Sequence, residues 1–129
     1  MKVKRFKNFD RITLYHGVKN EADVEAILKN GFDLSKIHPL WQNDYAVSTL
    51  TSPKAVHKFF GKSVPVLELE FEGTLGERPN IIASDAKDYT RQMVKMGIDA
   101  VILDSDNNVH QVFVYNPKAI KKITLYKQK

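Results

Sequence analysis

A histidine followed directly by a glycine, His16-Gly17, ends a short run of alternating residues and is the first feature that could do chemistry. A strand that ends there would hold the imidazole on a rigid element. Because glycine lacks a Cβ, a flat ligand can lie against its backbone N–H and C=O. Tyr45 and Gln111 fall on two further predicted strands, where they would add an aromatic face and a primary amide. Together these residues predict a pocket for a nucleotide that carries an aromatic amide.

The elements that must position these residues follow from alternation and from helix-capping signals. The pattern predicts the order strand, helix, strand, helix, strand, helix and then three strands, which is an α+β organisation. The predicted strands cover 11–16, 45–50, 64–71, 99–103, 110–115 and 121–126. A loop is expected over 32–44 and a turn-rich connection over 73–80.

Three helices are predicted between the strands. Asn20 is expected to cap a helix over 21–30, with Gly31 as its stop. Ser52 followed by Pro53 is the preferred opening of a second helix, which Gly61 ends. Ser84 or Asp85 is expected to cap a third helix that ends at Gly97, with Tyr89, Met93 and Met96 facing a core.

The composition is that of one soluble domain covering residues 1–129, with 43% hydrophobic and 27% charged residues. The absence of cysteine excludes a disulfide framework, thiolate catalysis and a thiolate zinc site, and it agrees with a reducing cytoplasm. We expect no signal peptide and no membrane span, because the sequence has no apolar run of the length that either requires. We also expect no bound metal, since the histidines do not fall at metal-ligand spacings.

The net charge of +5 is concentrated near the two ends of the chain. If the terminal strands are neighbours, their lysines form one basic patch that attracts phosphate, nucleic acid or an acidic protein. The alternative interpretation is a solvated surface that keeps the protein soluble, because charge runs alone discriminate poorly.

The segments 14–17, 45–50 and 111–117 resemble the motifs of the ADP-ribosyltransferase superfamily, in the branch of diphtheria toxin and the poly(ADP-ribose) polymerases. The first is similar to the first-strand motif, and the second to the tyrosine strand that leads into a helix. The third, with 97–102 before it, is similar to the closing strands. The resemblance covers most of the chain and implies split antiparallel β-sheets with flanking helices.

The resemblance also implies NAD as a substrate and a catalytic set of His16, Tyr45 and Gln111. In the family the histidine binds the adenosine-side ribose, and the glycine backbone, here Gly17, holds the nicotinamide carboxamide. The tyrosine ring stacks on nicotinamide. Gln111 stands where the family has glutamate, aspartate or sometimes glutamine.

Three further residues are candidates for binding NAD. Ser48 and Thr49 would make polar contacts from the tyrosine strand, and Phe59, on the helix that follows, could wall the nicotinamide pocket. The alternative for an aromatic residue at this helical spacing is a place in the core.

The glutamine restricts the activity that the resemblance implies. A primary amide neither acts as a base nor carries charge, and the family associates polymer elongation with glutamate, so the resemblance with Gln111 in this place implies single transfer rather than strong elongation. We therefore expect a mono-ADP-ribosyltransferase that cleaves the nicotinamide–ribose bond and modifies a macromolecular acceptor, either protein or nucleic acid. The alternatives are a silent binding module of the same fold and an RNA 2′-phosphotransferase-like enzyme. A role as toxin, phage effector or housekeeping factor, and the oligomeric state, stay open.

Overall fold

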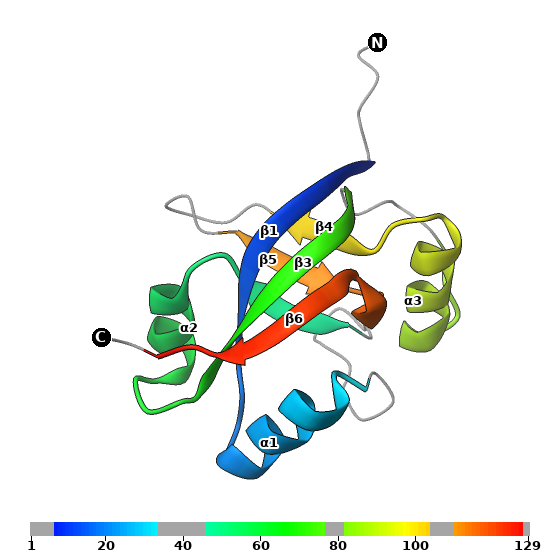
Figure 1. Cartoon of the computed structure of the whole chain (residues 1–129). Coiled ribbons are helices and arrows are strands. Elements are labelled where there is room, and N and C mark those ends of the chain that lie inside the picture. The colour runs from blue at the N-terminus through cyan, green and yellow to red at the C-terminus, as the bar shows by residue number, and fades with distance from the viewer. Residues whose placement is uncertain (1–6, 34–45, 77–81, 104–109, 128–129) are drawn as a thin grey trace.

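The computed structural model describes residues 7–33, 46–76, 82–103 and 110–127, which form a mixed α+β domain (Figure 1). Its strands are β1 (Lys7–Gly17), β2 (Val47–Leu50), β3 (Val66–Gly76), β4 (Ala100–Leu103), β5 (Gln111–Val114) and β6 (Ile120–Leu125). Its helices are α1 (Glu21–Asn30), α2 (Pro53–Phe60) and α3 (Ala86–Lys95), and a short 3-10 helix, η3 (Pro117–Ala119), precedes β6. The predicted order of elements is confirmed over the described residues.

The first two helices begin and end where the capping residues predict. The side chain of Asn20 accepts the N–H of Asp23 at 2.9 Å, and Ser52 Oγ accepts the N–H of Ala55 at 3.4 Å. Gly31 and Gly61 follow the two helices with φ of 78° and 103°, a left-handed conformation that favours glycine.

The third helix has one of its two predicted caps but ends earlier than predicted. Its cap is Asp85, whose carboxylate accepts the N–H of Asp88 at 2.8 Å, and the helix ends at Lys95 rather than at Gly97. Met93 is buried as predicted, but the prediction that Met96 faces a core is wrong, since 43% of Met96 is exposed. The reason is that Met96 lies past the last helical turn, where the periodicity no longer applies.

Two antiparallel units of three strands make up the sheet. One unit has the order β1-β3-β6 and the other β2-β5-β4, and they lie one behind the other in Figure 1. The units join at two corners. At the first, β1 meets β2 through the single pair Tyr15–Leu50. At the second, β3 meets β4 in parallel through Leu75–Ala100 and Gly76–Val101.

The two central strands are longer than predicted. β1 and β3 pair over eleven residues each, from Lys7–Gly76 to Gly17–Val66. The prediction of a turn from Gly73 onward is wrong for residues 73–76, while 77–80 lie outside the described residues. Gly73 is part of the strand, where it pairs with Asp10, and a Cβ there would stand 2.7 Å from Asp99 Oδ2 and 2.9 Å from Ala119 Cβ. The glycine marks a close approach of neighbouring groups, not a turn.

Asp99 holds the second corner together. Its Oδ2 accepts the N–H of Thr74 at 2.8 Å, and its own N–H donates to Thr74 O at 2.9 Å. Asn116 Nδ2 donates to the other carboxylate oxygen at 2.8 Å, so both oxygens are used. The carboxylate thereby ties β3 to the start of β4 and to the end of β5.

The main core lies on the inner faces of the two strand units. Leu14, Leu67, Val47 and Val112 are fully buried there, and Val24 closes it from α1. Smaller apolar clusters lie under α3 and under α2, on the outer faces of the strands.

The two terminal strands are not direct neighbours. β1 and β6 pair with β3 on opposite sides, so the terminal strands are separated by one strand. Lys2, Lys4 and Arg5 lie outside the described residues. In the described part of the chain, no helix is long and apolar enough to cross a membrane.

Candidate functional site

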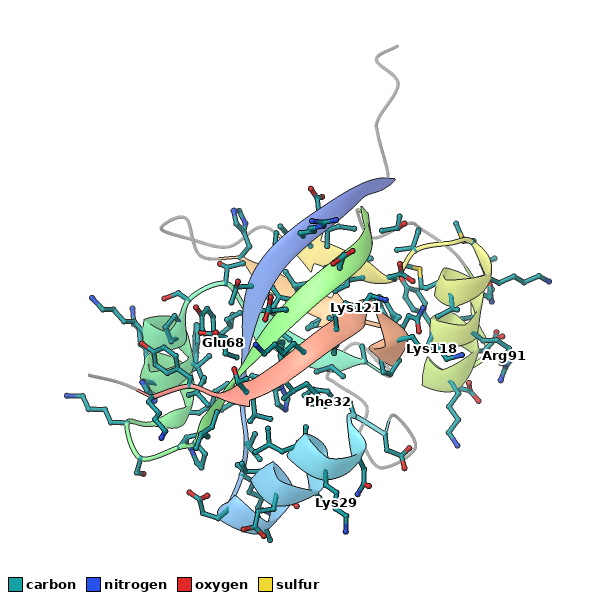
Figure 2. All side chains as sticks on the ribbon, in the orientation of Figure 1. Lys29, Phe32, Glu68, Arg91, Lys118 and Lys121 are labelled. Carbon is teal, nitrogen blue, oxygen red and sulfur yellow. The ribbon has the colours of Figure 1, made fainter. Side chains whose placement is uncertain are left out.

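His16 lies near the end of β1, where the two strand units begin to separate. Its Nδ1 donates to the backbone carbonyl of Ser48 on β2, at 2.6 Å. The ring of Phe32 meets the imidazole edge-on, with the ring centroids 5.1 Å apart. Figure 2 shows Phe32 between α1 and the strands. The bond to Ser48 O assigns the Nδ1–H tautomer to the neutral imidazole and leaves Nε2 as an acceptor.

Burial sets the charge of this imidazole. Desolvation lowers the pKa of His16 below its usual value of 6.5, and the bond to the carbonyl of Ser48 opposes that shift. The neutral ring therefore predominates at neutral pH. A neutral imidazole suits the binding of a ribose hydroxyl, which needs an acceptor as much as a donor.

The backbone pairing opens at Gly17. The N–H of Val18 donates to Pro65 O at 2.9 Å, so residues 18 and 65 form a hydrogen-bonded pair and residues 17 and 66 do not. The carbonyl of Val66 points the other way, to the N–H of Tyr126 at 2.8 Å. The N–H and C=O of Gly17 therefore point away from β3 and toward β2.

Beyond Tyr15–Leu50, the next pair in the β1–β2 register would be Gly17–Ser48, and it is not formed. The imidazole of His16 takes the carbonyl of Ser48 instead. Within the described residues, this leaves the N–H of Gly17 without a strand partner, beside the histidine ring. The result is a backbone donor at an opening between two strands, and primary amides bind to such groups.

Gly17 also lies against α2. A Cβ at this position would stand 3.0 Å from Val56 Cγ1, 3.3 Å from Phe60 Cδ2 and 3.4 Å from Val64 Cγ1. The Phe60 ring thus lies next to the Gly17 backbone, while 60% of Phe60 remains exposed. Of the two adjacent aromatic residues, Phe60 and not Phe59 is the one placed beside the glycine. The helical spacing singled out the pair, but only the packing of α2 on β1 distinguishes its members.

Gln111 opens β5 and is half-buried. Leu50 pairs with Tyr15 on one side and with Gln111 on the other, so these three residues form one row across β1, β2 and β5. Side chains in such a row share a face, and Gly17, two residues from Tyr15, belongs to the same face. The sheet thus brings Gly17 and Gln111 to one face of the strands.

His16 belongs to the opposite face, which it shares with Leu14. Its ring reaches the carbonyl of Ser48, and a β-strand carbonyl lies in the plane of the strands. The imidazole therefore stands in the opening between β1 and β2 rather than on the face that carries Gln111. In the described part of the chain, no hydrogen bond joins His16 to Gln111.

The remaining predicted residues divide between scaffold, surface and undescribed segments. Tyr45 lies outside the described residues. Ser48 contributes its backbone carbonyl to His16, and Thr49 Oγ1 is buried and donates to Val112 O at 2.8 Å, which ties β2 to β5. Phe59 is 68% exposed at the end of α2, so it is not a core residue.

One residue near the site carries a signal that the sequence did not single out. His110 precedes Gln111, and its Nδ1 is buried without a hydrogen-bond partner among the described residues. Its backbone is tied to Thr51 by two bonds, at 2.9 and 3.0 Å. Only the tertiary structure reveals the burial, since neither spacing nor composition distinguishes this histidine.

We compared the chain with protein-family models, with curated proteins and with solved structures, and none of them matches it.

Proposed function

We propose that this protein is a mono-ADP-ribosyltransferase, which cleaves the nicotinamide–ribose bond of NAD and transfers ADP-ribose to a macromolecular acceptor. One observation carries the proposal: the pairing of β1 with β2 stops at Gly17, beside an imidazole that binds Ser48 O. The N–H of Gly17, which has no strand partner among the described residues, and the C=O of the same glycine match the carbonyl and the amino group of a carboxamide. The split arrangement of the strand units agrees with the sheet architecture that the sequence resemblance implies.

The reaction requires no covalent bond between the protein and the substrate. The C–N bond between ribose and nicotinamide breaks, the bonding electron pair leaves with nicotinamide as a neutral molecule, and positive charge develops on the ribose. A lone pair of the acceptor then forms the new bond to the same carbon, and the proton of the acceptor passes to solvent. The protein must grip the carboxamide, orient the sugar and bring the acceptor close.

The residues of the site divide these tasks. The backbone of Gly17 holds the carboxamide, and the exposed ring of Phe60 packs on the nicotinamide beside it. His16, with Nδ1 bound to Ser48, offers Nε2 to a ribose hydroxyl. Gln111 donates to and accepts from a second ribose hydroxyl, from the face that Gly17 shares. Tyr45 keeps the stacking role that the resemblance gives it.

The test is the release of nicotinamide from NAD, measured by chromatography with a cell lysate as the acceptor source. We expect release by the wild-type protein, and a loss of about 10- to 1000-fold in the rate for His16→Ala and for Gln111→Ala. His57→Ala, on α2, is the matched control and should retain the rate. Intact NAD after prolonged incubation with the wild-type protein would contradict the proposal.

Two alternatives make different predictions in the same assay. A silent binding module would leave NAD intact and yet bind a partner with a steep dependence on salt. An RNA 2′-phosphotransferase would act only on an oligonucleotide that carries a 2′-phosphate. We also propose a cytoplasmic location, which suits a cysteine-free protein that consumes NAD.

A further inference from the structure

One surface next to this site combines exposed aromatic rings with positive charge. It consists of Lys54, Lys58, Phe59, Phe60 and Lys62, and we call it the α2 surface. Phe59 and Phe60 are 68% and 60% exposed, more than any other aromatic residue whose exposure is described. An exposed pair of phenylalanines costs solubility, so it is typical of a surface that binds something.

The position of α2 explains why the rings are exposed. Ala55 and Val56 are buried against the strands, and Phe59 and Phe60 follow each of them by one helical turn on the same side. The apolar stripe of α2 thus continues past the edge of the core. Ala55 and Val56, in the first turn of this stripe, pack into the core, whereas Phe59 and Phe60, in the second, remain largely exposed to solvent.

The charge around the two rings is of one sign. Residues 52–63 contain three lysines and no aspartate or glutamate. Lys54, Lys58 and Lys62 are exposed, and within the described residues none of them forms an ion pair. At 100° per residue, Lys54 and Lys58 lie one turn apart on the same side of the helix, and Phe59 and Phe60 follow Lys58 at successive steps of 100° around its last turn. The chain after β6 runs beside the same helix, since Tyr126 packs against the cluster that contains Ala55 and Val56 of α2.

Aromatic faces flanked by unpaired cations match the chemistry of a single-stranded nucleic acid, in which unpaired bases stack and phosphates need neutralising. A duplex hides its base faces, so it would use the lysines and not the rings. A membrane surface fits less well, because α2 has only eight residues and two exposed rings. Moreover, Phe60, the chain neighbour of Phe59, lies beside Gly17, so the α2 surface adjoins the proposed nicotinamide position.

We infer that the α2 surface binds single-stranded nucleic acid and presents it as the acceptor of the ADP-ribosyl group. Phe59 stacks on a base, and Lys54, Lys58 and Lys62 contact phosphates. The acceptor role rests on the proposed function, whereas the binding itself does not, and it is tested without NAD.

The binding test uses the full chain and a fluorescein-labelled 15-nucleotide single strand of mixed sequence, as RNA and as DNA, followed by fluorescence anisotropy. We expect binding that weakens with salt, with a slope of log K against log salt of about −2 for three phosphate contacts. Phe59→Ala should weaken binding about 5- to 150-fold with little change in this slope. Lys58→Ala should make the slope less steep by about 0.7.

Helix α1 provides matched controls. Leu28 and Lys29 are an exposed apolar residue and an exposed lysine in its last turn, as Phe59 and Lys58 are in α2. Figure 2 shows Lys29 pointing outward from α1. Leu28→Ala and Lys29→Ala should leave binding unchanged. Because Phe59 is mostly exposed, Phe59→Ala should keep the melting temperature and the circular dichroism of the wild type.

Three outcomes would overturn the inference. In the first, the wild-type protein fails to bind either single strand at 50 mM salt. In the second, the α1 variants lose as much binding as the α2 variants, or a duplex binds as tightly as the single strand. Either result would indicate charge attraction without specificity for this surface. In the third, the protein binds vesicles of phosphatidylcholine and phosphatidylserine through Phe59 and does not bind the oligonucleotides.

A second assay separates the failure of this inference from the failure of the proposed function. With labelled NAD and the oligonucleotide as the only acceptor, we expect label on the oligonucleotide, and we expect slower labelling by Phe59→Ala and by His16→Ala. Nicotinamide release with a protein acceptor alone would retain the proposed function and overturn the acceptor assignment. Oligonucleotide binding without any cleavage of NAD would retain the surface and contradict the enzyme.

Discussion

At position 17 the chain requires a residue without a side chain for a reason of packing, not of backbone conformation. Gly17 lies in an extended strand, but a Cβ there would meet Val56 at 3.0 Å and Phe60 at 3.3 Å. The absence of a side chain therefore has two effects in this fold. It lets α2 approach β1, and it leaves the backbone of Gly17 accessible at the opening between β1 and β2.

We expect Gly17→Ala to destabilise the protein by about 1–3 kcal/mol, because the methyl group overpacks the contact with α2. Unfolding in urea, followed by circular dichroism, measures the change. Combining it with Val64→Ala, which removes one of the contacting methyl groups, should cost less than the sum of the two single changes. If the two effects add, the alanine methyl group at position 17 does not press on Val64, and the proposed contact is wrong.

The same substitution, Gly17→Ala, also tests the role of Gly17 in the reaction. Gly17→Ala should lose nicotinamide release even where the protein is still fully folded, because the methyl group and the displaced Phe60 ring occupy the position proposed for nicotinamide. A folded variant with the wild-type rate would contradict the role of Gly17.

At the scale of the elements, two corners join the strand units, and they use different chemistry. The first corner has one strand pair and the His16–Ser48 bond, so it stays partly open. The second is closed by Asp99, whose carboxylate accepts from Thr74 and Asn116. The proposed site lies at the open corner, and the closed corner maintains the arrangement of the units.

Asp99→Ala should therefore destabilise the fold by about 1–3 kcal/mol, since it leaves the N–H of Thr74 and the amide of Asn116 without their acceptor. Chemical denaturation gives the change in unfolding free energy. Glu70→Gln is the control: Glu70 is exposed on β3 and lies 3.9 Å from Lys122, and surface pairs of this kind contribute at most about 1 kcal/mol. Equal effects of the two substitutions would contradict a special role for Asp99.

At the scale of the whole molecule, the imidazole of His16 lies between the two strand units, so its protonation acts on the stability of the entire fold. Burial lowers its pKa in the folded state below the unfolded value of 6.5. Between the folded and the unfolded pKa, the unfolded chain binds more protons, so unfolding becomes easier as the pH falls. The contribution of His16 to stability is therefore complete above pH 6.5 and is lost as the pH decreases through that value.

We expect the free energy of unfolding to decrease between about pH 7 and pH 5, and to decrease less in His16→Gln, whose amide does not titrate but can still donate to Ser48 O. Urea unfolding at several pH values measures both slopes. His57→Gln, on α2, removes a histidine away from this contact and should retain the wild-type slope. Identical slopes for wild type and His16→Gln would contradict the assignment.

The order of the nine predicted elements and the caps at Asn20 and Ser52 could be predicted from the sequence, because alternation and capping depend on residues close together in the chain. The lengths of β1 and β3 could not, since each of these strands extends as far as its distant partner supplies hydrogen bonds. The role of Gly73 could not be predicted either. A glycine at this point favours a turn, and only the tertiary structure shows that Asp99 lies beside it.

For the candidate site, the sequence alone determined which residue types are present: a histidine before a glycine, and a glutamine that opens a later strand. Only the tertiary structure decided that the β1–β2 pairing ends at Tyr15–Leu50, that Phe60 rather than Phe59 lies beside Gly17, and that Gln111 shares the face of Gly17 and not that of His16. The physical reason is that the register between distant strands and the seating of a helix depend on contacts among residues far apart in the chain, which local patterns do not encode.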